Sequence, residues 1–151
     1  ISYRLVGSEM CIRDSPYNAP HEAARKVLAE GLIRLGVITQ SLDEALDMKS
    51  GQLKDWYMHN TSHWIGLDVH DVGVYLPDGK PRLLESGMCL TVEPGLYFGA
   101  WRPDVVCPER YANIGIRIED DILVTDDGPI VLTDKCPKTI DEIEHIVGNT
   151  V

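Results

Sequence analysis

Apolar residues follow a helical period near the start of the chain. After Pro20 they recur at steps of three and four positions, and Gly36 follows the last of them: Ala24, Val27, Leu28, Leu32 and Leu35. Such spacing places one apolar stripe along an α-helix, and glycine often ends a helix because it adopts left-handed angles without strain. Ser41 and Glu44 then have the spacing of a capping box. The pattern predicts a long amphipathic helix ending at Gly36, followed by a short helix that begins at Ser41.

After Trp56 the pattern changes to β-branched residues with partial alternation, which is typical of strands. The sequences PDGK, ESG and DDG separate the apolar stretches, because Gly, Pro and Asp accept the backbone angles of tight turns. The pattern predicts strands linked by hairpins at 64–76, 88–94, 114–125 and 129–133.

Two further segments complete the expected organisation. From Pro94 to Asn113 the chain has three prolines and two glycines, which predict a long loop. Thr139 and Glu142 repeat the capping-box spacing and predict a final helix at 140–147. Helices before and after a run of hairpin-linked strands indicate an α+β fold, a mostly antiparallel sheet with helices on one face.

Composition excludes several classes of partner. The formal net charge is −10 and the 14 basic residues are scattered, so no nucleic acid is expected to bind. No apolar run is long enough to cross a bilayer, so no membrane partner is expected. The four cysteines lack metal-ligand spacing, and the simplest interpretation is a reduced, cytoplasmic protein.

Three of the five histidines, His59, His63 and His70, lie within twelve residues. The β-branched residues around them and Gly66 disfavour a helix there. On a regular strand, His63 and His70 point to opposite faces. They can share a site only if the strand ends or bulges between Gly66 and Asp68.

Two glutamates lie at strand ends: Glu93 and Glu119. On the strand expected at 114–119, the isoleucines share one face, whereas Arg117 and Glu119 share the other. A carboxylate beside an apolar face is costly unless it is paired, hydrogen-bonded or bound to metal. Alone, Glu119 could be a surface partner of Arg117, and His63 a core histidine. Together, one histidine and two glutamates suit Mn, Co, Fe or Zn, so we expect His63, Glu93 and Glu119 to converge on one concave face.

Three motifs carry a resemblance to a known family. HNTSHWIGLDVHD at 59–71, LTVEPGLY at 90–97 and GIRIEDD at 115–121 are similar, in order and spacing, to the C-terminal motifs of the pita-bread metallopeptidases. The resemblance is strongest to the Xaa-Pro aminopeptidases (aminopeptidase P), and it extends from about Pro20 to about Val147. It implies the C-terminal portion of a pita-bread (creatinase/aminopeptidase) fold.

The resemblance also implies an activity. The expected function is a dinuclear-metal aminopeptidase that removes the N-terminal residue from peptides with proline in second position. Two divalent metal ions would serve as cofactors, with manganese expected first and Co, Zn or Fe as alternatives. A homo-oligomer is expected for the full-length enzyme. The sequence departs from the family at Asn60, where glycine or another small residue is usual.

The resemblance assigns roles to the site residues. His63 would bind one metal, Glu119 would bridge both, and Glu93 would bind a metal and act as general base. These roles suit peptide hydrolysis, because a two-metal site generates hydroxide near neutral pH.

The other two histidines, His59 and His70, would contact the proline side of the substrate and the developing oxyanion. Arg117 and Tyr97 would orient the carboxylates.

Two aspartate ligands that the family needs, upstream of the helices, have no counterpart in this sequence. We therefore expect 16–151 to be a truncated C-terminal part of a catalytic domain, inactive alone. Residues 1–15 have no sustained period and resemble translated sequencing-adapter text, so they are expected to be a non-native leader.

Two alternatives remain within the same fold. One is a metal-free binding module, and the other is a metal-free hydrolase of the creatinase type. Both are weakened because a protein that had lost its metals would usually have lost His63, Glu93 or Glu119, and the sequence keeps all three.

Overall fold

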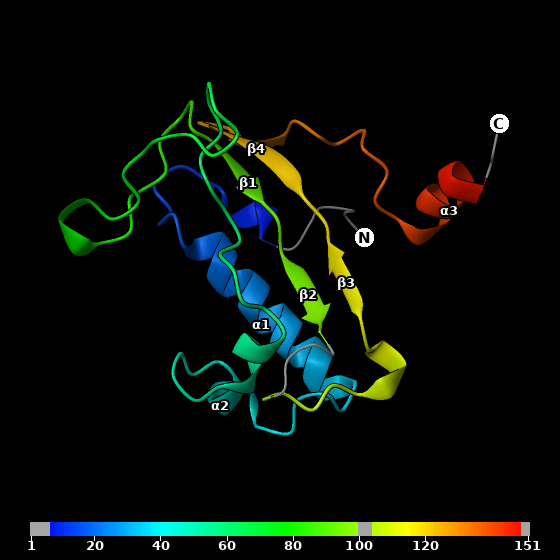
Figure 1. Cartoon of the computed structure of the whole chain (residues 1–151). Coiled ribbons are helices and arrows are strands. Elements are labelled where there is room, and N and C mark those ends of the chain that lie inside the picture. Colours follow the sequence, from blue (N-terminus) through cyan, green and yellow to red (C-terminus); the bar gives the residue numbers. More distant parts are fainter. Residues whose placement is uncertain (1–6, 100–103, 149–151) are drawn as a thin grey trace.

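The computed structural model describes residues 7–99 and 104–148 (Figure 1). After a 3₁₀ turn at Ser8–Met10, the chain forms helices and strands in this order: α1 Ala19–Arg34, α2 Leu42–Ala45, β1 Cys89–Val92, β2 Gly95–Phe98, β3 Ile114–Arg117, β4 Asp120–Thr125, β5 Gly128–Val131 and α3 Ile140–Gly148. All strand pairs are antiparallel, and α1 runs alongside them (Figure 1). The α+β class predicted from the sequence is confirmed. No helix among the described residues is long and apolar enough to cross a membrane.

The predicted helix signals are confirmed at the level of single hydrogen bonds. Gly36 has a φ of 70°, and the N–H groups of Gly36 and Val37 donate to the carbonyls of Ile33 and Leu32. This is a Schellman motif, which satisfies the last carbonyls of α1. Both halves of the capping box at Ser41 are formed. At α3, the side chains of Thr139 and Glu142 exchange hydrogen bonds with each other's backbone in the same way.

β1 and β2 run as one arm of a long hairpin, and β4 and β3 form the other. The pairing Val92 with Asp120 and the pairing Gly95 with Arg117 belong to one continuous register. Regular pairing lapses for two residues on each arm, so the structure contains a three-stranded sheet, β1-β4-β5, and a two-stranded sheet, β2-β3. Pro94 lies in this gap, where its missing N–H removes a ladder donor.

Three sequence predictions about strands are wrong. The expected loop from Pro94 to Asn113 begins with β2, because its glycines and proline concealed a strand that pairs with β3. The strand expected at 114–125 is divided into β3 and β4.

The expected strand at 64–76 does not form. Its only ladder contact within the described chain is an isolated bridge between Trp64 and Leu90. The chain turns at Gly66, whose N–H donates to Asp68, and the N–H of Asp71 returns to the carbonyl of Trp64. Alternating apolar residues here instead face solvent: the relative exposure of Leu67 is 102% and that of Val72 is 90%.

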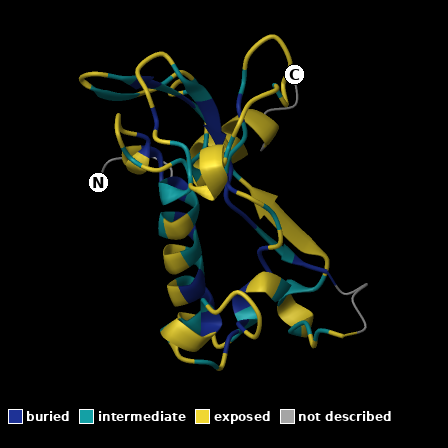
Figure 2. Cartoon of the chain, turned by 90° about the vertical axis from the view of Figure 1, so that its left-hand side faces the viewer, coloured by how far each residue is buried: buried dark blue, intermediate teal, exposed yellow. Residues whose placement is uncertain are grey.

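The core has two apolar clusters. One joins α1 to the loop around Trp56 and to Phe98 of β2, with Leu32 fully buried. The other lies under β1 and β4 and includes Trp64 and Leu90. In Figure 2 buried residues lie along one side of α1 and on β1 and β4, whereas β3 is exposed along its length. The two clusters therefore support the two halves of the long hairpin.

The segment before α1 packs against this second cluster. Cys11 is fully buried there, and the backbone of Asp14 and Ser15 bonds to Leu84. Arg13 forms an exposed ion pair with Asp126. The idea that residues 1–15 are a non-native leader stays a prediction, and residues 1–6 of that segment lie outside the described part of the chain.

Gly73, in the bend that follows the histidine motif, has no room for a side chain. A Cβ there would lie 2.3 Å from Cδ1 of Trp64, a rigid ring that is itself packed in the second cluster. We expect Gly73→Ala to displace the indole and to destabilise the fold by about 1–3 kcal/mol, as overpacking does. Urea unfolding followed by tryptophan fluorescence would measure the change.

The matched control for Gly73 is Gly31→Ala in the middle of α1. A Cβ at Gly31 meets nothing within 4 Å, so alanine should stabilise the helix by about 0.5–1 kcal/mol. Destabilisation by both substitutions, or by neither, would contradict the packing argument.

Candidate metal centre

The continuous register of the long hairpin places the candidate residues on one face. Because side chains alternate along a strand, Thr91, Glu93 and Tyr97 share a face of the first arm, and Arg117 and Glu119 share the matching face of the second. The register also places Glu93 opposite Glu119, inside the gap between the two sheets. The predicted division of 114–119 into an isoleucine face and a charged face is confirmed.

His63 reaches this face from an irregular segment that runs beside β1. The N–H groups of Thr91 and Glu93 donate to the carbonyls of His63 and Thr61, at 3.0 and 2.8 Å. The N–H of His63 donates to the hydroxyl of Thr91 at 3.0 Å. These bonds bring the histidine motif to the end of β1, next to Glu93.

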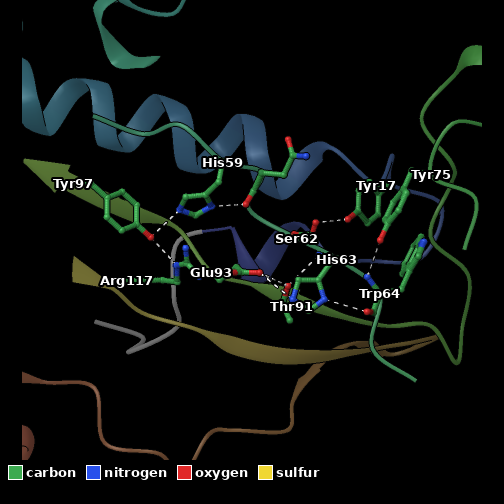
Figure 3. Close-up of polar contacts among 11 residues, drawn as sticks. Tyr17, His59, Ser62, His63, Trp64, Tyr75, Thr91, Glu93, Tyr97 and Arg117 are labelled. Atoms are coloured by element: carbon green, nitrogen blue, oxygen red, sulfur yellow. Dashed lines mark hydrogen bonds and ion pairs between the residues drawn. The ribbon is translucent and has the colours of Figure 1, made fainter. Parts of the chain in front are cut away.

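The carboxylate of Glu93 is the centre of the polar contacts (Figure 3). Its Oε1 accepts a hydrogen bond from the Thr91 hydroxyl at 3.1 Å and lies 3.1 Å from Nε2 of His63. Its Oε2 lies 3.2 Å from Nη1 of Arg117. The side chain of Glu93 is only 9% exposed, so these partners offset the cost of burying its charge. Arg117 forms its ion pair with Glu93, whereas the sequence had suggested Glu119 as a surface partner.

The structure brings His63, Glu93 and Glu119 together, as predicted. Each offers one ligand atom, and these atoms lie within 4.8 Å of one another. Metal–ligand bonds of about 2.0–2.2 Å to nitrogen and oxygen need only small side-chain movements from this arrangement. Burial raises the pKa of Glu119, and the neighbouring charges of Glu93 and Asp121 raise it further. A divalent cation would relieve this crowding of carboxylates, so the donor set fits a metal ion.

His63 presents the correct nitrogen for such a role. Its Nδ1 lies 3.1 Å from the carbonyl of Trp64, and a carbonyl can only accept, so Nδ1 carries the proton. Nε2 is the atom that faces Glu93, and as the second ring nitrogen it is the one that would bind a metal ion. A hydrogen bond of this kind sets the tautomer and direction of a metal-binding histidine.

His59 belongs to a separate chain of hydrogen bonds on the same face. Nε of Arg117 donates to the hydroxyl of Tyr97 at 2.7 Å, and that hydroxyl lies 3.0 Å from Nε2 of His59. The hydroxyl of Tyr97 accepts from arginine, and its own proton is available to Nε2 of His59. Nδ1 of His59 then donates to the carbonyl of Asn60 at 2.7 Å. Arg117 thus links the Glu93 carboxylate to His59 through Tyr97.

His70 lies beside His63, so the backbone between them does not continue as a regular strand. The ring centroids are 4.4 Å apart with the planes at 90°. Pairing with β1 ends at Ile65, and the bend that begins at Gly66 returns His70 to the site. The prediction that His70 faces the same cleft as His63 is confirmed, although pairing already ends at Ile65, before the expected break between Gly66 and Asp68.

A cleft of 620 Å³ contains most of these groups. The three histidines of the motif, Glu93 and Arg117 line it, together with Tyr17 and Tyr75. Glu119 is not among the lining residues; it is exposed beside them, with its carboxylate within reach of the other two ligands. Asn60, which departs from the family pattern, also lines the cleft and does not have the positive φ that would favour glycine.

Sequence reasoning missed several residues of the site. Thr91 could have been predicted as a neighbour of Glu93, because it lies two positions before it on the same face of a strand. Tyr17 and Tyr75 could not have been predicted, since they approach from remote segments. His21 was also missed: its Nδ1 lies 2.8 Å from the Thr61 hydroxyl, and burial lowers the pKa of this imidazole, which favours its neutral form.

The sequence is similar to those of known metallopeptidases. The sequence profile of metallopeptidase family M24 matches residues 5–126. Xaa-Pro aminopeptidase of Escherichia coli is 47% identical over 122 residues, which is 81% of this chain and 26% of the relative. Xaa-Pro aminopeptidase 1 of Streptomyces coelicolor is 45% identical over 130 residues, which is 85% of this chain and 26% of the relative.

Solved structures show the same fold. Aminopeptidase PepP of Pseudomonas aeruginosa superposes with a TM-score of 0.85 at 40% identity, covering 95% of this chain and 31% of that one. Aminopeptidase P of Escherichia coli with the inhibitor Pro-Leu superposes with a TM-score of 0.77 at 43% identity, covering 93% of this chain and 31% of that one. The chain therefore spans between a quarter and a third of the length of these relatives. With its profile match, its relatives and its pita-bread fold in agreement, the chain belongs to metallopeptidase family M24.

Proposed function

We propose that this chain forms one part of the active site of a dinuclear-metal Xaa-Pro aminopeptidase, which removes the N-terminal residue from peptides with proline in second position. The observation that carries the proposal is the convergence of His63, Glu93 and Glu119 within 4.8 Å. The substrate class is supported by the relatives, which are Xaa-Pro aminopeptidases. Manganese is the proposed metal, with Co, Zn or Fe as alternatives, and the proposed setting is a cytoplasmic homo-oligomer.

The residues of the chain divide the work of hydrolysis. His63, Glu93 and Glu119 would hold the metal ions, which supply Lewis acidity and lower the pKa of water when bound. Glu93 accepts a proton from the attacking water as the new carbon–oxygen bond forms. The same proton then passes to the proline nitrogen as the carbon–nitrogen bond breaks.

Two histidines flank the reacting group. His70 is close enough to His63 to contact the carbonyl oxygen as it gains negative charge. His59 is held by Tyr97 on the other side of the cleft, where it would contact the proline side of the peptide. Arg117 keeps the Glu93 carboxylate oriented through Oε2.

A chimera tests the proposal. The matched segment of the Escherichia coli enzyme is replaced by the corresponding residues of this chain, so that the remainder of that enzyme supplies the other ligands. We expect the chimera to release arginine from Arg-Pro-Pro in the presence of Mn²⁺, and the 151-residue chain alone to show no hydrolysis, since it offers three of the five ligands that the family uses.

The two proteins serve as each other's controls. A chimera that folds and binds Mn²⁺ but does not cleave Arg-Pro-Pro would contradict the proposed activity. Hydrolysis by the 151-residue chain at a rate comparable to that of the chimera would contradict the need for further ligands.

A further inference from the structure

We propose that Tyr17 and Tyr75 are positioning residues for His63, because they hold the peptide groups immediately before and after it in the chain. The proposal rests on the metal-binding function inferred for His63, and it concerns how that imidazole is kept in place. Each tyrosine hydroxyl bonds to a peptide group next to His63, and in the described part of the chain neither one bonds to Glu93, Glu119 or the His63 ring.

The need for such support follows from the local backbone. Among the described residues, His63 lies outside every strand, and backbone bonds at Thr61, His63 and Ile65 join its segment to β1. The chain bends away directly after Ile65. A metal ligand in such a segment needs additional contacts, because small displacements of a ligand weaken a metal site.

The two tyrosines supply these contacts to the residues before and after His63 (Figure 3). The hydroxyl of Tyr17 donates to the carbonyl of Ser62, the residue before His63. The hydroxyl of Tyr75 accepts from the N–H of Trp64, the residue after His63, at 3.4 Å. Tyr17 comes from the segment before α1 and Tyr75 from the loop after the histidine motif. Two separate parts of the chain therefore hold the peptide groups that flank His63.

Ring packing restricts the movement of Tyr17 and Tyr75. The centroid of Tyr17 lies 4.7 Å from that of Trp64 and 4.9 Å from that of Tyr75. The rings of Trp64 and Tyr75 are stacked, with 6° between their planes. Trp64 is itself 8% exposed and belongs to the second core cluster. The hydroxyl groups are therefore presented from a packed aromatic group, with little freedom to move.

The two tyrosines hold the peptide groups that orient the imidazole of His63. The carbonyl of Trp64 accepts the Nδ1 proton of His63, and the N–H of the same residue is held by Tyr75. Displacing Trp64 would rotate the imidazole and turn Nε2 away from Glu93. Removing the hydroxyls should therefore change the ligand geometry while the aromatic packing remains.

The test uses Tyr17→Phe, Tyr75→Phe and the double variant, each in the chimera and in the 151-residue chain. In the chimera, calorimetric titration with Mn²⁺ should show affinity about 10–100-fold lower for the double variant, the usual cost of losing partners behind a metal ligand. In the chain without metal, the ring resonances of His63 in ¹H–¹³C NMR spectra should shift. Those of His145, in the distant α3, should not.

Tyr111→Phe is the matched control, because its ring packs on Phe98 in the first core cluster, away from the cleft. It should change neither the Mn²⁺ affinity nor the His63 resonances. The proposal is overturned if the double variant keeps both at their original values, or if Tyr111→Phe reproduces its effects. An inactive chimera in which the His63 resonances still respond to Tyr17→Phe would count against the proposed enzyme activity. It would still support the positioning role of the tyrosines.

Discussion

Replacing Glu93 by alanine in the chimera is expected to lower kcat/KM for Arg-Pro-Pro by about 10²–10⁴-fold, the range usual for a general acid or base. The expected effect is large because one side chain has several partners. Its Oε1 lies 3.1 Å from His63 and its Oε2 lies 3.2 Å from Arg117. Steady-state kinetics together with the metal content of the purified protein would measure the loss.

Glu93→Gln separates the roles of this carboxylate. Glutamine keeps the size of the side chain and can still bond to Thr91, but it is neutral and cannot take a proton from water. We expect kcat to fall as far as in the alanine variant while the fold is better preserved. Activity of either variant within about tenfold of the parent would exclude Glu93 as the base, since tenfold corresponds to only about 1.4 kcal/mol of barrier.

The largest stability change is expected at Asp120, which follows the candidate ligand Glu119. Asp120 is 1% exposed, and its Oδ1 accepts from the Thr133 hydroxyl at 2.6 Å and lies 3.0 Å from Nζ of Lys138. Asp120→Ala would leave a poorly exposed ammonium group without its anion. Breaking a buried pair in this way costs about 3–5 kcal/mol, which urea unfolding would measure as a lower midpoint.

Two further variants serve as controls for Asp120→Ala. Asp126→Ala breaks the ion pair with Arg13, in which both side chains are more than half exposed, and it should change stability little. The double variant Asp120→Leu, Lys138→Met removes both charges and should recover much of the loss. A loss as large for Asp126→Ala as for Asp120→Ala would contradict the role of burial.

Sequence reasoning succeeded where contacts are local. The capping boxes at Ser41 and Thr139 and the end of α1 at Gly36 depend on residues a few positions apart, so their spacing was sufficient. The division of 114–119 into two faces depends only on strand alternation. The motifs also indicated the family correctly.

Sequence reasoning failed where distant segments decide the backbone. β2 was taken for loop because Pro94 and its glycines resemble a turn, yet Gly95 lies in the strand beneath the Tyr97 ring, where a Cβ would lie 2.8 Å from the Tyr97 hydroxyl. The stretch 64–76 alternates like a strand, but β1 already has β4 on its other edge and meets this stretch only as far as Ile65. Period alone could not distinguish an exposed bend from a strand.

The sequence by itself determined which residues could bind metal and which faces of the strands carry them, because both follow from residue type and alternation. Only the tertiary structure decided that Glu93 and Glu119 oppose each other in one gap, that the chain bends to return His70 to His63, and that Tyr17 and Tyr75 hold the peptide groups around His63. These relations join segments many residues apart. They are set by strand register and by the packing of aromatic rings around Trp64, neither of which is expressed in any local pattern.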